Sequence, residues 1–261
     1  MLGVVLIKFI SFSIIANFQE KTIPSNKTLV IGDSHIERGW KPREFEDNIA
    51  KSAQSLLYTI AKLRRFDLKS EKTTLIIGIS NITFNQKALL GADYFLERSF
   101  CYLNLSEHAY LMRNFPLKWL KTFVSINANM LKSPYDNTGF APMSVGDTLK
   151  RATNQMSIVS QKDIDNNIGF LALRQFINDN PELKVVLVRM PLYTENNSLS
   201  NEDKFQKFIG LLIKENENIS FVDFYKLNIL FEAEYFYDWD HLNAKGADSL
   251  YNYRLNNIIK F

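Results

Sequence analysis

The sequence predicts an α/β protein, a three-layer α/β/α sandwich in which helices cover both faces of a parallel sheet. Short runs of continuous apolar residues, typical of strands buried on both sides, alternate with longer segments in which apolar residues recur at helical spacing. The chain has 261 residues, of which 46% are hydrophobic. That length and composition suit one globular domain with a substantial core and at most a small addition to it.

Four apolar runs are the predicted strands of this sheet. They lie at residues 28–31, 73–79, 184–190 and 219–224. The first run leads directly into Gly32, which predicts a buried strand that ends in a tight turn.

Helical spacing marks four further segments. Residues 53–66 carry apolar side chains at helical intervals and end in basic residues, which suit the negative end of a helix dipole. The other three predicted helices lie at about residues 163–178, 202–215 and 244–259. Helices placed between strands in this way complete the alternation expected of a parallel sheet.

The middle of the chain, at about residues 91–154, interrupts the alternation. Its first part is rich in aromatic residues and its second part is loop-like, with several prolines and glycines. We expect a partly helical insertion beside the sheet. Its aromatic side chains either pack within the insertion or form a lid or the wall of an acyl pocket.

The first 18 residues are apolar with a single charge, at Lys8. We expect a membrane anchor or a signal-like segment here, and a buried helix or strand is the alternative. Residues 19–27 are polar and contain Pro24, which predicts a linker to a domain over 28–261. The segment favours a cell-envelope location, exported or membrane-anchored, over a cytoplasmic one.

Composition excludes several classes of partner. The net charge is +3 and the basic residues are scattered, so no nucleic-acid surface is predicted. Cys101 is the single cysteine, which excludes an intrachain disulfide, and there is no cluster of cysteines and histidines. We therefore expect neither a metal site nor a cofactor.

Gly32, Asp33, Ser34 and His35 follow the first predicted strand directly. In open α/β sheets, functional sites form at the carboxyl ends of strands. A serine there projects its hydroxyl into the crevice, with backbone N–H groups nearby as donors to an oxyanion. An ordinary turn or helix cap is the alternative interpretation.

Asp238 and His241 belong to a second motif near the end of the chain. A histidine removes the proton of a serine hydroxyl near neutral pH. A carboxylate three residues before it in a loop reaches the far ring nitrogen and fixes its tautomer. Asp238 has that spacing; Asp240 remains a second candidate. A solvated acidic loop capped by Asn243 is the alternative.

Together, Gly32-Asp33-Ser34 and the Asp-Trp-Asp-His-Leu-Asn segment that ends at Asn243 resemble the SGNH (GDSL-type) hydrolase superfamily. The resemblance spans about residues 28–261. It implies a flavodoxin-like sandwich with about five parallel strands. It also implies Ser34 as nucleophile, His241 as base and Asp238 as the acid that orients the base.

The resemblance also implies an oxyanion hole formed by Ser34, a glycine and an asparagine. Ala53 stands at the glycine position, and Asn81 lies one residue beyond the asparagine position, so Ser80 is an alternative donor. His35, Ser80 and Arg189 are possible substrate-lining residues, although a half-exposed turn position for His35 and a structural role for Arg189 are favoured.

These residues predict ester chemistry through an acyl-enzyme, by a serine esterase or an O-acyltransferase. The expected partner is a small-molecule or carbohydrate ester, such as an acylated cell-envelope polysaccharide. Membrane association through residues 1–18 is also expected. The alternative is a catalytically impaired domain that binds glycans or assists envelope assembly. A phosphate-binding domain ranks last, because the sequence has no Gly-rich phosphate loop.

Overall fold

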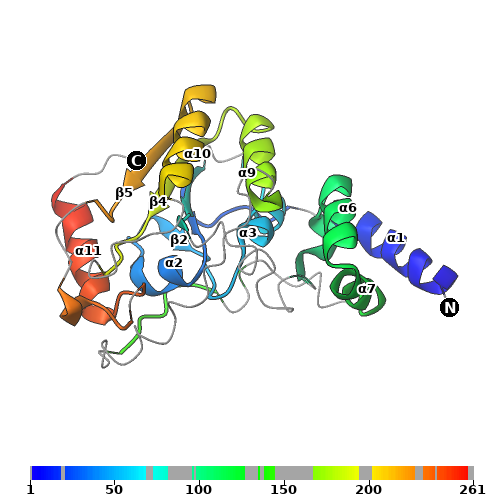
Figure 1. The fold of residues 1–261 in the computed structure, drawn as a ribbon, viewed down its shortest axis with the longest axis horizontal. Helices are drawn as coiled ribbons and strands as arrows, with labels where there is room; N and C mark the ends of the chain where they lie inside the picture. The colour runs from blue at the N-terminus through cyan, green and yellow to red at the C-terminus, as the bar shows by residue number, and fades with distance from the viewer. Residues whose placement is uncertain are drawn as a thin grey trace.

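Five parallel strands form the central sheet of the computed structural model (Figure 1). The model describes residues 2–18, 21–68, 73–81, 96, 98–126, 135, 138–144, 167–193, 202–226, 232–238 and 240–257. The strands are β1 (Thr28–Ile31), β2 (Glu46–Asn48), β3 (Thr74–Gly78), β4 (Lys184–Arg189) and β5 (Ile219–Asp223), in the spatial order β2-β1-β3-β4-β5. The predicted fold class is confirmed.

Helices cover the sheet on both faces. They are α2 (Ser34–Gly39), α3 (Leu56–Leu63), α9 (Ile168–Asn178), α10 (Glu202–Glu215) and α11 (Ala244–Asn256). Alternate strand residues separate into two apolar clusters, with Leu75 and Ile77 in one and Ile76 in the other. The first cluster includes side chains of α3, α9 and α10, and the second includes side chains of α2 and α11. This two-sided burial explains the continuous apolar runs in the sequence.

The four predicted strands agree with the structure to within two residues at each end. The fifth strand, β2, was not predicted. It is a three-residue edge strand, Glu-Asp-Asn, with no apolar run to mark it. Its buried Glu46 accepts hydrogen bonds from the indole of Trp40 and from both the backbone of Arg43 and the guanidinium of Arg254. These ionic contacts, rather than apolar burial, fix the edge of the sheet.

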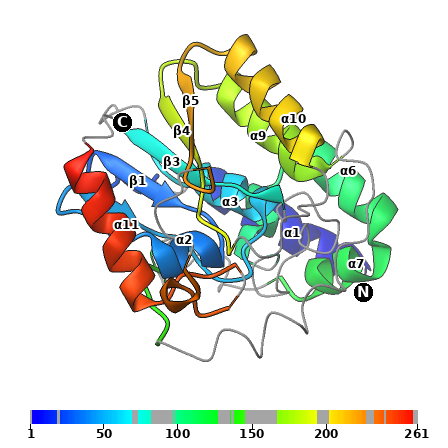
Figure 2. The ribbon, with the colours of Figure 1, turned by 60° about the vertical axis from the view of Figure 1, so that its left-hand side comes forward.

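The insertion contains the helices α6 (Leu105–Asn114) and α7 (Pro116–Val124) and a 3-10 turn, η2 (Phe100–Tyr102). The N-terminal segment forms the helix α1 (Leu2–Phe18), which packs against η2 and α7. Figure 2 shows α1, α6 and α7 grouped together beside the sheet domain. Among the described residues, no helix combines the length and the hydropathy needed to span a membrane.

Candidate active site

The turn after β1 positions the first site residue. A side chain at Gly32 would meet Ile36 at 2.7 Å and the backbone of Gly78 at 3.2 Å, so only glycine allows α2 to start this close to the strands. Asp33 caps α2 by accepting the N–H of His35 at 3.0 Å. Ser34 is the first residue of the helix, and it therefore lies at the carboxyl edge of the sheet.

The second motif forms a tight loop before α11. The Asp238 carboxylate accepts the backbone N–H of His241 at 2.8 Å and that of Asp240 at 3.2 Å. The N–H of Tyr237 donates to the carbonyl of His241 at 2.8 Å. Asn243 caps α11 and is fully buried. These local bonds fix the backbone that carries His241.

The two motifs meet at hydrogen-bond distance. His241 Nε2 lies 2.7 Å from Ser34 Oγ. On the other side of the ring, His241 Nδ1 lies 2.9 Å and 3.0 Å from the two carboxylate oxygens of Asp238. The serine, the histidine and the acid thus form a continuous chain, although Ser34 and His241 are separated by 207 residues of sequence. A hydroxyl, a base and an orienting carboxylate in this order are the parts needed to activate a serine nucleophile.

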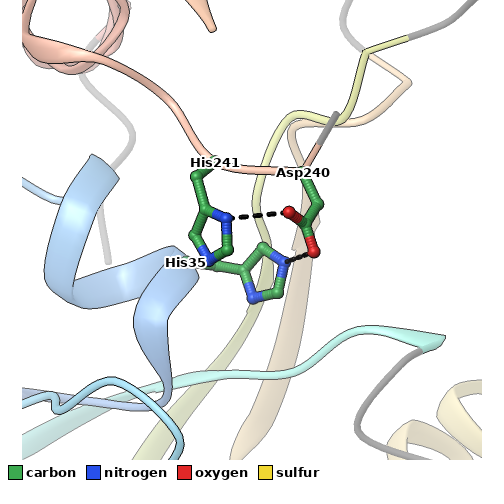
Figure 3. Close-up of side chains that lie close together, drawn as sticks. All are labelled: His35, Asp240 and His241. Carbon is green, nitrogen blue, oxygen red and sulfur yellow. Dashed lines mark ion pairs between the residues drawn. The ribbon is translucent and has the colours of Figure 1, made fainter. Parts of the chain in front are cut away.

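Asp240 adds a second carboxylate to the base (Figure 3). Its Oδ1 lies 2.8 Å from His241 Nδ1, and its Oδ2 lies 3.3 Å from His35 Nε2. Neither contact has the angles of a hydrogen bond, whereas the contact between Asp238 and His241 does. The geometry therefore favours Asp238 as the orienting acid and gives Asp240 an electrostatic position between two imidazoles.

His35 is not the half-exposed turn residue expected from the sequence. Its side chain is only 7% exposed and its ring stacks on that of His241, with centroids 4.9 Å apart. His35 Nδ1 contacts Asp33 at 2.9 Å, while its Nε2 faces Asp240. The expectation failed because the partner ring and Asp240 come from a distant loop. The sequence signal was that two of the three histidines lie within the two site motifs.

Contacts between the carboxylates and the imidazoles shift the pKa values in this cluster more than burial does. Burial alone lowers the pKa of His241, but the contacts with Asp238 and Asp240 outweigh it and raise that pKa to about 9. Burial likewise opposes a charged His35, and Asp33 and Asp240 raise its pKa well above the ordinary value. The pKa of Asp240 falls below its usual range because both histidines outweigh its desolvation. The carboxylates around the two imidazoles therefore favour the charged form of each ring.

The same cluster is the one place in the described ranges where histidine and carboxylate ligand atoms gather within 4.8 Å, at His35, Asp240 and His241. A divalent ion fits such a donor set in principle. Here each imidazole already faces a carboxylate, and Asp238 occupies the Nδ1 side of His241. We therefore interpret the cluster as an ion-pair network.

Arg189, the last residue of β4, and Asn81, after β3, contact each other and acidic side chains, which agrees with the favoured structural role for Arg189. Arg189, a possible substrate-lining residue, is fully buried and forms ion pairs at 2.6 Å with both Asp223 and Glu202. Asn81 accepts a hydrogen bond from Arg189 at 3.1 Å and donates one to Glu202 at 2.8 Å. Arg189 therefore does not line a surface that a substrate can reach. The Asn81 amide is bound within the Arg189 cluster, and no bond from it to Ser34 is present.

Ser80 is also buried. It borders a small hollow together with Asp33, His35 and Met190. Ser80 thus lies near His35.

Ala53 lies in the loop after β2, close to the nucleophile turn. The N–H of Lys51 donates to the carbonyl of Gly32 at 3.1 Å, and the N–H of Ser52 donates to Glu37 of α2 at 2.9 Å. Among the described residues, the N–H of Ala53 has no acceptor. Ala53 has a φ of 61°, the left-handed conformation that favours glycine. Alanine therefore stands here in a backbone conformation that glycine adopts more readily.

Comparison with known proteins gives similarity to solved structures alone. Two catalytic mutants of Axe2, an acetylxylan esterase from Geobacillus stearothermophilus, are each 14% identical to this chain. They cover 92% and 93% of it, and 97% and 98% of their own lengths, with TM-scores of 0.43 and 0.44. A Streptococcus pneumonia protein provisionally described as a platelet activating factor is 11% identical over 98% of this chain and 94% of its own, with a TM-score of 0.40. No family model and no curated protein matches the chain.

Proposed function

We propose that the protein is a serine-dependent esterase or O-acyltransferase that works through an acyl-enzyme at Ser34. The observation that carries the proposal is the chain from Ser34 Oγ through both ring nitrogens of His241 to Asp238. A purely structural role does not account for a histidine held between a serine hydroxyl and a carboxylate at the carboxyl edge of a parallel sheet.

The chemistry begins when neutral His241 accepts the Ser34 hydroxyl proton through Nε2 and Ser34 Oγ attacks the acyl carbonyl. Asp238 stabilises the imidazolium that forms and holds its orientation. His241 then protonates the leaving alcohol, and the acyl group remains on Ser34. Water or a sugar hydroxyl, deprotonated by His241, takes the acyl group and restores the serine.

Two backbone N–H groups are available for the developing oxyanion. As the first residue of α2, Ser34 has an N–H with no intrahelical acceptor, and the N–H of Ala53 is unoccupied among the described residues. The Asn81 amide, which the family resemblance assigns to this role, is held by Arg189 and Glu202. Ser34 and Ala53 are therefore the donors of the proposed oxyanion hole.

The second candidate function is a catalytically impaired domain that binds glycans. It is favoured by the engagement of Asn81, because losing one oxyanion donor typically lowers turnover by about 10²–10³-fold. The proposed substrate in either case is an acylated carbohydrate, such as one of the cell envelope. A binding module, however, needs no aligned Ser34, His241 and Asp238.

Labelling of the purified full-length chain with a fluorophosphonate probe tests the nucleophile. We expect labelling of the wild type and of the control variant Ser106→Ala, which changes an exposed serine of α6. We expect none in Ser34→Ala and a rate at least about 10³-fold lower in His241→Ala. Labelling that survives in Ser34→Ala contradicts the assignment, and a wild type that never reacts favours the impaired binding domain.

Short-chain aryl esters, assayed with and without a sugar acceptor, then separate hydrolysis from transfer. An acyl sugar product together with release of the aryl alcohol identifies a transferase. Release that is independent of the acceptor identifies an esterase.

A further inference from the structure

The end of the molecule formed by α1, α6 and α7 exposes an unusual amount of apolar side chain. Leu105 is 88% exposed, Leu117 83%, Val4 70% and Ile7 67%. Figures 1 and 2 show these three helices together, away from α11 and the site loops. Further exposed apolar side chains on the same helices are those of Leu6, Ile10, Ile14, Ile15, Met112, Leu120 and Val124.

The helix α1 cannot bury this surface by itself. It is apolar on every side, with Lys8 as its single charge, whereas a helix at an ordinary protein surface has one polar face. One of its sides does pack on the insertion: the ring of Phe9 lies 5.8 Å from that of Phe100 and 5.4 Å from that of Phe123. The helix is thereby held alongside α7, and most of its other described side chains are exposed.

The exposed charged residues of these three helices are all basic. Lys8, Arg113, Lys118 and Lys121 are their basic residues, and each helix lacks an exposed acid. The single acidic residue, Glu107, is buried and forms a bidentate pair with Arg64 at 2.7 Å. The three helices therefore expose apolar side chains and carry a net positive charge of their own.

A cavity of about 760 Å³ adjoins the same surface, between α1 and α6. Lys21 lines it together with Asn104 and Ser106. A basic side chain and hydrogen-bond donors beside exposed apolar helices match the chemistry of an anionic lipid, with its acyl chains on the helices and its phosphate near the mouth of the cavity.

We propose that α1, α6 and α7 together form a surface that binds an anionic lipid bilayer. We call it the lipid-facing surface, and it goes beyond residues 1–18 because α6 and α7 supply its most exposed leucines and three of its cations. A second copy of the chain fits less well, since a symmetric contact places these cations against one another. The proposal is independent of the chemistry at Ser34.

Vesicle flotation of the full-length chain tests the surface. Vesicles of phosphatidylcholine alone are compared with vesicles in which about a third of the lipid is phosphatidylglycerol. We expect stronger binding to the anionic vesicles and loss of that difference at high salt. The triple variant Arg113→Gln, Lys118→Gln, Lys121→Gln is expected to bind them about 10²-fold less, at about 1 kcal/mol for each basic residue.

Two matched pairs of leucine variants isolate the apolar contribution of α6 and α7. Leu105→Gln with Leu117→Gln is expected to reduce binding at least tenfold. Leu171→Gln with Leu211→Gln, exposed leucines on α9 and α10, is expected to leave it unchanged. Ser34→Ala is expected to bind like the wild type.

Three results overturn the proposal. The first is equal binding of the Leu105/Leu117 pair and the wild type, which limits any contact to α1. The second is equal binding to neutral and anionic vesicles. The third is a dimer in light scattering that the Leu105/Leu117 pair dissociates, without vesicle binding, which makes the surface an interface between copies.

Discussion

The proposed nucleophile side and the proposed oxyanion side of the site lie at the same edge of the sheet but are built differently. On the nucleophile side, Ser34, His241 and Asp238 are within hydrogen-bond distance of one another, and local backbone bonds fix both loops. On the oxyanion side, Ala53 takes a left-handed conformation and Asn81 is bound to Arg189 and Glu202. Ser34 and His241 are thus aligned even though the side chain of Asn81, one of the expected oxyanion donors, is bound elsewhere.

The difference is sharpest in the role of charge. On the proposed nucleophile side, Asp33, Asp238 and Asp240 surround two imidazoles and favour the charged form of His241. On the proposed oxyanion side, Arg189 is fully buried and paired with carboxylates, and the proposed donors are uncharged backbone N–H groups.

Replacing each of the two acids beside His241 gives the largest expected effect. Asp238→Asn removes the hydrogen-bonded acid and is expected to lower kcat by about 10³–10⁴-fold, since the wrong tautomer of His241 is then favoured. Asp240→Asn removes a contact that acts through the pKa of His241, and it is expected to change kcat by less than about tenfold in either direction. Steady-state assays on an aryl ester measure both. The reverse order of effects makes Asp240 the orienting acid.

The pH dependence tests the charges around the base. Because His241 must be neutral to accept a proton and its pKa is about 9, kcat/KM is expected to rise with pH from neutrality to about 9. Asp240→Asn removes a negative charge, lowers the pKa of His241 and shifts the profile to lower pH. His35→Gln removes a positive charge and shifts the profile to higher pH. NMR titration of the His241 ring measures its pKa in both variants without an activity assay. If both variants shift that pKa in the same direction, the proposed charge network is wrong.

Asn81→Ala separates the two possible roles of that residue. If its amide serves the Arg189 cluster, the variant loses about 1–3 kcal/mol of stability and changes kcat by less than about tenfold. Urea unfolding and ester assays of the same preparation give both quantities. A 10²–10³-fold loss of kcat at unchanged stability would instead make Asn81 an oxyanion donor.

Ala53→Gly has the smallest expected effect. Glycine relieves the left-handed strain but adds freedom to the unfolded chain, so the net gain in stability is expected to be up to about 1 kcal/mol. The urea midpoint measures it. A loss of stability indicates that the Ala53 methyl group makes a contact that outweighs the strain.

The sequence predicted the parts of this molecule that depend on local patterns. Continuous apolar runs identified four strands of the sheet, and the spacing of Asp238 and His241 agrees with their contact in the structure. It did not predict β2, whose Glu46 is stabilised by Arg254 from the other end of the chain. Nor did it predict the stack of His35 on His241, because such contacts join distant segments.

The close approach at Gly32 and Gly78 has a mechanical consequence. Ile36, a residue of α2, packs directly against Gly32 and Gly78 at the ends of β1 and β3. The distance between α2 and the sheet is therefore set by the small size of these two residues, and this distance in turn positions Ser34 relative to His241. A methyl group added at either glycine would displace α2 and the Ser34 hydroxyl, although neither glycine contacts His241 or Asp238.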